Sequence, residues 1–78
     1  MLSQFEKKIL HECYSHYLKT NSREYTYVAK NGDDLVLATN SFYDLEENGY
    51  ISNLVEEVTA FTFLIEYPLI SYMKQEEL

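Results

Sequence analysis

The side chains best suited to chemistry lie in one short run, His11, Glu12, Cys13 and His16. A zinc site of the metalloprotease kind needs two histidines four residues apart on a helix, so that both rings face the metal. Here they are five apart, so at about 100° per residue they point about 140° away from each other. Cys13 and His16 could share a face, but two ligands do not make a zinc site and the chain has no other Cys or His. We therefore expect both histidines to be ordinary helix residues, Cys13 to be a core residue, and the chain to hold no metal or cofactor.

Two pairs of adjacent carboxylates, Asp33-Asp34 and Glu46-Glu47, are the other candidates for acid–base chemistry. Neighbours in sequence point in different directions, and no His lies in the same half of the chain. The sequence has no glycine-rich phosphate loop, and its 78 residues leave little room for a substrate cavity. We expect these pairs to form a solvated acidic surface, with no small-molecule substrate, and predict that the chain is not an enzyme.

Charge is distributed unevenly along the chain. Residues 31 to 73 contain eight Asp and Glu and no Lys, Arg or His, which gives −8, whereas residues 1 to 30 carry five Lys and Arg against three Glu, which gives +2. DNA affinity comes largely from Lys and Arg that displace counterions from phosphates. The acidic segment is therefore expected to repel nucleic acid, and a protein partner is favoured.

Length and composition predict a single domain over residues 1-78. The apolar fraction is 46%, with eight Tyr and four Phe, which is typical of a folded chain. A domain this small buries only about 60 to 65% of the surface of its unfolded chain, so association with itself or a partner would add stability. One cysteine excludes an intramolecular disulfide, and we find neither a secretory signal nor an apolar run that could span a bilayer. We expect a cytoplasmic protein, free of the membrane, that forms a homodimer or binds another protein.

Residues 3 to 20 are predicted to form a helix. Ser3 followed by Glu6 is a capping-box pattern, and apolar side chains recur every three or four residues on one face. These side chains are Leu2, Phe5, Ile9, Cys13, Tyr14 and Tyr17. The polar run after Thr20 ends the helix.

Residues 23 to 39 allow two interpretations. Asn31-Gly32 between two apolar runs is typical of a β-hairpin, because both residues accept the positive φ values of a type I′ turn. Alternatively, apolar residues recur at helical spacing, with Asp33 or Asp34 as the cap and Gly49 just past the end. Those apolar residues are Leu35, Ala38, Phe42 and Leu45. We favour a helix from about 34 to 48, with residues 25 to 28 in a short strand or a short helix.

The last third of the chain is predicted to be mostly strand. Tyr50 and Ile51 begin one strand, and aromatic and branched side chains alternate from Val58 to Tyr67, which is typical of a second. Residues 53 to 57 are then expected in the connection between the two. Pro68 ends the second strand, and residues 69 to 73 form a short final helix.

Six tyrosines exceed what a small core can bury with every hydroxyl hydrogen-bonded. In one interpretation they ring the core with hydrated hydroxyls; in the other, some belong to an aromatic surface rimmed by carboxylates, since Tyr is favoured at interfaces. The six are Tyr25, Tyr27, Tyr43, Tyr50, Tyr67 and Tyr72.

The run Leu45-Glu46-Glu47-Asn48-Gly49-Tyr50-Ile51 resembles the end of the recognition helix and the entry to the wing in winged-helix domains of small bacterial and phage regulators. In that family the Leu packs inward, the Gly ends the helix, and the aromatic-aliphatic pair begins the first wing strand. Residues 64 to 73 are similar to the segment that follows the wing. The resemblance implies an α+β fold, a small winged-helix-like domain with an N-terminal helix, a central helix, a wing sheet of two or three strands and a short C-terminal helix.

The charge departs from that family's usual pattern, in which DNA-binding members carry basic or small polar side chains on the recognition helix and a basic wing. Base readout needs phosphate contacts to hold the register, so we expect a protein-interaction module instead. The residues expected at the contact are Asp44, Glu47, Glu56 and Glu57. A nucleic-acid-mimicking inhibitor is the extreme form of this hypothesis. The alternative is a DNA-binding transcriptional regulator whose dimer gathers the basic residues Lys7, Lys8, Lys19, Arg23 and Lys30.

Overall fold

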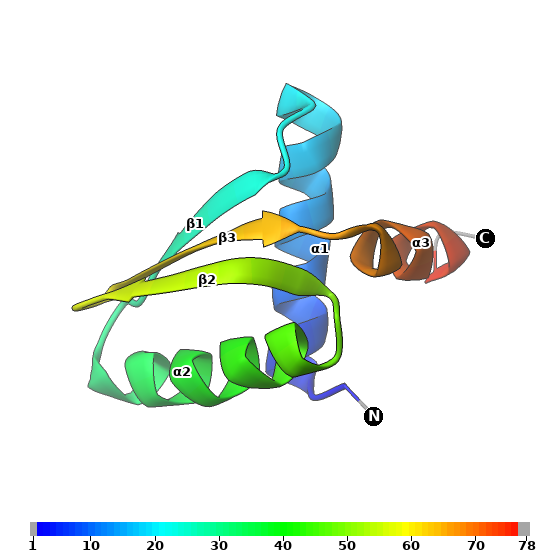
Figure 1. The fold of residues 1–78 in the computed structure, drawn as a ribbon. Helices are drawn as coiled ribbons and strands as arrows, with labels where there is room; N and C mark the ends of the chain where they lie inside the picture. The colour runs from blue at the N-terminus through cyan, green and yellow to red at the C-terminus, as the bar shows by residue number, and fades with distance from the viewer. Residues whose placement is uncertain (1, 77–78) are drawn as a thin grey trace.

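The computed structural model describes residues 2 to 76, which form three helices and a three-stranded antiparallel sheet. In chain order the elements are α1 (Gln4–Thr20), β1 (Glu24–Val28), α2 (Gly32–Glu47), β2 (Ile51–Glu57), β3 (Ala60–Ile65) and α3 (Tyr67–Glu76). The strands lie in the order β1-β3-β2, so the last strand is the central one. Helix α2 lies along β2, α1 crosses behind the sheet, and α3 follows directly from β3 (Figure 1). The predicted α+β class and small winged-helix-like layout are confirmed.

Helix α1 begins where its capping box predicts. Ser3 Oγ accepts the Glu6 N–H at 3.1 Å, and Glu6 Oε1 accepts the Ser3 N–H at 2.8 Å. Asn21 then ends the helix in the left-handed region, with φ of 59°. Ile9, Cys13 and other side chains of the predicted face are buried, so the rotation of α1 against the core was also predicted correctly.

Helix α2 occupies the segment that had two interpretations. The hairpin is wrong, because Asn31 is the N-cap and Gly32 the first helical residue. Asn31 Oδ1 accepts the Asp34 N–H at 2.9 Å, so the cap lies earlier than the predicted Asp33 or Asp34. The favoured helix is therefore confirmed, with its start moved two residues toward the N-terminus.

The C-terminus of α2 is closed by Gly49, as predicted. Gly49 has φ of +82°, a conformation that glycine adopts without strain. The Tyr50 N–H donates to the Leu45 carbonyl at 3.0 Å, and the Gly49 N–H donates to the Glu46 carbonyl at 3.1 Å. These two bonds form a Schellman motif that turns the chain directly into β2.

The hairpin of β2 and β3, which we call the wing, differs from the prediction in its bounds. Residues 53 to 57 were expected in the connection but belong to β2, and only Val58 and Thr59 form the turn. The strand predicted from Val58 to Tyr67 was too long at both ends, since β3 covers Ala60–Ile65 and Tyr67 lies in α3. A turn of two β-branched residues has none of the Gly, Asn or Asp that mark hairpins in a sequence. For residues 25 to 28, the strand is the correct alternative.

Strand β2 has a bulge that places α2 against its outer edge. Ser52 pairs with Leu64 and Val55 with Thr62, so two residues of β2 face one residue of β3. Within the bulge, Asn53 has φ of 53°. The Leu54 N–H donates to Glu46 Oε2 of α2 at 3.1 Å. The Glu46 carboxylate thus occupies one backbone N–H of β2, which is an edge strand of the sheet.

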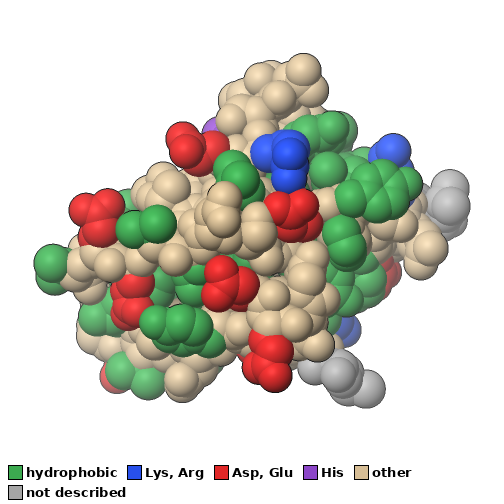
Figure 2. All heavy atoms as spheres, viewed as in Figure 1, with side chains coloured by type: hydrophobic (Ala, Val, Ile, Leu, Met, Phe, Trp, Pro, Cys, Tyr) green, Lys and Arg blue, Asp and Glu red, His purple; other side chains and the backbone are tan. Residues whose placement is uncertain are grey.

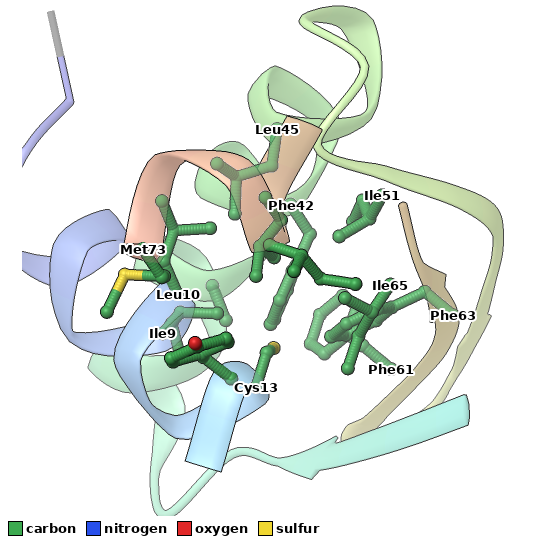
Figure 3. Packing of buried hydrophobic residues seen from close by; sticks show 14 residues of the cluster. Ile9, Leu10, Cys13, Phe42, Leu45, Ile51, Phe61, Phe63, Ile65 and Met73 are labelled. Carbon is green, nitrogen blue, oxygen red and sulfur yellow. The ribbon is translucent and has the colours of Figure 1, made fainter. Parts of the chain in front are cut away.

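The core lies between one face of the sheet and the three helices. The ring of Phe42 is at its centre, with centroids 5.0 Å from both Phe61 and Phe63 (Figure 3). Alternate β3 residues, including these two phenylalanines, are buried, whereas Thr62 and Leu64 on the other face are only partly covered. The helices therefore cover a single face, and the outer face of the sheet is open to solvent.

Candidate protein interface

The side of α2 that points away from the core carries apolar and acidic side chains together. Val36 is 64% exposed and Tyr43 is 52% exposed. Asn40 and Glu47, both exposed, continue the same stripe at spacings of three and four. An exposed apolar patch rimmed by polar residues is typical of a site for protein contact.

Tyr43 joins this stripe to the wing. Its hydroxyl donates to Glu56 Oε1 on β2 at 2.8 Å. This hydrogen bond and the negative charge of Glu56 raise the pKa of Tyr43, so the phenol stays protonated at neutral pH. We call Val36, Asn40, Tyr43, Glu47 and Glu56 the α2–β2 face.

Two of the four predicted contact residues lie outside the α2–β2 face. Asp44 lines an open groove of about 580 Å³ where Lys7 of α1 and Tyr72 of α3 meet the end of α2. Glu57 follows Glu56 in a strand, so its side chain points to the outer face of the sheet. The structure therefore groups Glu47 with Glu56 and separates Asp44 and Glu57 from them.

The adjacent carboxylate pairs are not uniform acidic surfaces, contrary to the prediction. Glu46 accepts the Leu54 N–H, and Asp34 accepts the Lys30 N–H at 2.9 Å and the Tyr27 hydroxyl at 2.7 Å. Their neighbours Glu47 and Asp33 are exposed. In each pair one carboxylate holds two elements together and the other faces solvent.

Three of the five basic residues of the first half either point in different directions or are paired. Lys7 and Lys8 lie about 100° apart around α1, and Lys7 lines the groove beside α3. Arg23 Nη2 lies 2.9 Å from Glu66 Oε1 in an ion pair. In Figure 2, carboxylates alternate with apolar side chains over α2 and β2, while the Lys and Arg side chains in view lie toward α1 and α3.

The six tyrosines divide between the two interpretations. Those at positions 25, 27, 50 and 72 pack partly buried against the core. Tyr43 and Tyr67, in contrast, are 52% and 70% exposed. Of these two, Tyr43 donates its hydroxyl to a carboxylate, that of Glu56, and it is the tyrosine that fits an acidic aromatic surface.

Cys13 and His16 of α1 have structural roles. His16 Nε2 donates to the Glu24 carbonyl at 2.9 Å, which fixes the start of β1. Cys13 is fully buried, as predicted, and burial raises the pKa of its thiol. Among residues 2 to 76, no group of three or more His, Cys, Asp or Glu could hold a metal ion, and no helix is long and apolar enough to cross a membrane.

Sequence reasoning missed the exposed apolar residues of α2, although a signal was present. Leu35, Ala38, Phe42 and Leu45 account for the core-facing stripe, and Val36 falls outside it. A second apolar stripe on the same helix, built from Val36 and Tyr43, is what a helical projection would have shown.

The chain matches no family model, and no curated protein or solved structure is significantly similar to it. The chemistry of the α2–β2 face is therefore the basis for assigning a function.

Proposed function

We propose that this chain is a non-enzymatic, winged-helix-like protein-interaction module that docks the α2–β2 face on a basic surface of a partner protein. The observation that carries this proposal is the half-exposed ring of Tyr43, held in place by Glu56 and flanked by Val36 and Glu47. Interfaces commonly combine an aromatic anchor with a charged rim. The carboxylates would steer a basic partner toward the anchor and disfavour acidic ones.

The position of α2 in the chain also favours a protein partner over DNA. In a helix-turn-helix, a short turn joins the recognition helix to a preceding helix that crosses the DNA backbone. Here α2 follows strand β1, which separates it from α1. The exposed side of α2 offers Val36, Tyr43 and Glu47 where a DNA-binding helix needs cations near the phosphates.

The tip of the wing also lacks basic side chains. Val58 is 90% exposed at the turn, next to the exposed Glu57. An apolar residue beside a carboxylate gives no attraction to phosphate. The tip of the wing therefore also disfavours DNA as the partner.

A pull-down from native lysate with paired charge reversals tests the proposed face. The double variant Glu47→Lys, Glu56→Lys reverses both carboxylates of the face, and Glu57→Lys, Glu76→Lys reverses two exposed carboxylates elsewhere. We expect the first variant to lose a specific band at least about tenfold and the second to retain it, since the net charge changes equally in both. Equal loss from both variants would show that net charge, rather than this face, causes the binding.

Binding to random-sequence duplex DNA separates the module from a DNA-binding regulator. We expect no retention on duplex at about 50 mM salt, because the acidic face offers no counterion release. Retention that falls steeply as salt increases would favour the regulator and contradict the proposal.

A further inference from the structure

Strand β1 has a free outer edge. The Arg23 carbonyl accepts the Ile65 N–H at 2.7 Å, and the Ala29 N–H donates to the Thr59 carbonyl at 2.8 Å. In an antiparallel pair, alternate residues direct their backbone groups to the same neighbour. The odd-numbered residues from 23 to 29 therefore face β3, and the even-numbered residues direct their N–H and C=O groups outward.

The outward groups of Glu24 are already occupied, whereas those of Thr26 and Val28 are open. The Glu24 N–H donates to Ser22 Oγ at 3.2 Å, and its carbonyl accepts from His16. Thr26 is exposed and Val28 is 60% exposed, and within residues 2 to 76 nothing bonds to their outward backbone groups. The other edge of the sheet is different, because the Glu46 carboxylate of α2 caps Leu54 there.

We propose that two copies of this chain associate by antiparallel pairing of their β1 strands, with Thr26 of each copy opposite Val28 of the other. In this register the two N–H and two C=O groups of each copy that are open form four hydrogen bonds between the copies. The contacts of Glu24 with Ser22 and His16 stay in place. The product is a continuous six-stranded sheet related by a two-fold axis at Tyr27.

Charge supports a second copy as the occupant of this edge. The register that places Thr26 opposite Val28 also brings Glu24 of each copy near Lys30 of the other, which lies two residues beyond the end of β1. Both side chains are exposed, and unlike charges opposite each other stabilise an antiparallel pair. Contact through β1 also leaves β2, which carries Glu56 and Glu57, on the far edge of each sheet, so these carboxylates of the two copies lie far from each other.

The contact is small, which sets the concentration at which it forms. Four main-chain hydrogen bonds and two pairs of β-branched side chains make less than a standard interface, so we expect a dissociation constant on the order of 100 µM. Sedimentation equilibrium from about 10 µM to about 1 mM covers this range.

The variant Thr26→Pro tests the edge directly. Proline removes the outward N–H of residue 26 and leaves the bonds between β1 and β3 intact, because that N–H does not face β3. We expect Thr26→Pro to stay monomeric up to about 1 mM, with unchanged circular dichroism, and the matched Thr26→Val to dimerise as the unaltered chain does. An unaltered chain that is monomeric throughout, or a dimer that persists in Thr26→Pro, would overturn the proposal.

A mixing experiment tests the register and does not depend on the proline variant folding. Glu24→Lys and Lys30→Glu each place like charges near each other in their own dimers, so each alone should dimerise at least about tenfold more weakly. An equimolar mixture restores unlike charges at both positions and should recover the original affinity as a heterodimer. Failure of the mixture to recover it would exclude this register. The experiment contains no basic partner, so its outcome is independent of the α2–β2 face.

Discussion

Asp34 shows how one carboxylate can fasten a strand to a helix. It accepts hydrogen bonds from the Lys30 N–H and from the Tyr27 hydroxyl, and these contacts hold the pKa of Asp34 below its ordinary value. Burial, together with the bond to Asp34, raises the pKa of Tyr27. The ionised carboxylate and the protonated phenol therefore stabilise each other at neutral pH.

Asp34→Asn should make the domain less stable in a pH-dependent way. Because the folded-state pKa lies below the unfolded value of about 3.9, the contribution is present above that pH and is lost as pH falls through the folded value. After allowance for solvent screening, we expect a loss of about 1 kcal/mol in unfolding free energy at pH 7. Urea denaturation of both proteins at about pH 7 and pH 3 measures it, and the difference should shrink at the lower pH.

Asp33→Asn is the matched control for this prediction. Asp33 lies in the same first turn of α2, so both substitutions remove one charge from the helix N-terminus. It lacks the bonds to Lys30 and Tyr27 that Asp34 has. A loss as large as that of Asp34→Asn would assign the effect to the helix dipole instead.

At the scale of the element, α2 begins at one glycine, Gly32, and is followed by another, Gly49, and the two need different backbone conformations. Gly49 has φ of +82°, whereas Gly32 is the first helical residue and its φ is not positive. A Cβ at either position would meet no atom within 4 Å. Any difference between alanine substitutions at the two sites must then come from the backbone and not from a clash.

Gly49→Ala should destabilise the domain by about 1 kcal/mol, because alanine is strained in the left-handed region. Gly32→Ala should be neutral or stabilising by up to about 1 kcal/mol, because alanine restricts the unfolded chain and fits the helix. Thermal unfolding of the two variants beside the unaltered chain measures both effects. A stabilising Gly49→Ala would contradict the Schellman geometry at the end of α2.

The elements that were predicted correctly are those determined by local contacts. The capping box of Ser3 and Glu6 and the Schellman turn at Gly49 each involve residues within five positions of one another. Asn31-Gly32 was ambiguous because the same pair suits a hairpin turn and a helix start. Packing of Phe42 against Phe61 and Phe63, about twenty residues away, decides between them, and a local pattern does not contain that information.

Only part of the candidate site was predicted, because the sequence does not show how β2 pairs with β3. Glu56 and Glu57 looked equivalent in the sequence, but successive residues of a strand point to opposite faces. The bulge at Asn53 determines which of them points toward α2, and a shift of one residue would exchange them. Glu56 joins the stripe of α2 that contains Glu47 because the Tyr43 hydroxyl, on the same stripe, donates to it.

At the scale of the whole molecule, the dominant feature is a net charge of −7, with a segment of −8 folded into α2 and the wing. Among residues 2 to 76, the one ion pair within 4 Å joins Arg23 to Glu66, so the other carboxylates of this segment have no cation in direct contact. Mutual repulsion of these carboxylates opposes the compact state. The domain is therefore expected to be more stable when salt screens its own charge.

Raising NaCl from about 20 mM to about 500 mM should raise the melting temperature by about 2 to 5 °C, because the Debye length falls well below the spacing of the acidic residues. Calorimetry at several salt concentrations measures the shift. The Glu57→Lys, Glu76→Lys variant reduces the net charge from −7 to −3, since each reversal adds two, and should respond less. An equal response in both proteins would mean that repulsion is not the cause.

The strand order β1-β3-β2 has a consequence for how the protein is made. Strands β1 and β2 do not pair with each other; both pair with β3, which leaves the ribosome after them. Thr26 therefore cannot pair until Thr62 has been synthesised, and no part of the sheet can form while synthesis has reached only Glu57. Pairing over so long a stretch of chain is slow compared with helix formation. During translation, the residues of α1 and α2 are therefore complete before any sheet can form, and the completion of β3 allows both strand pairs to form together.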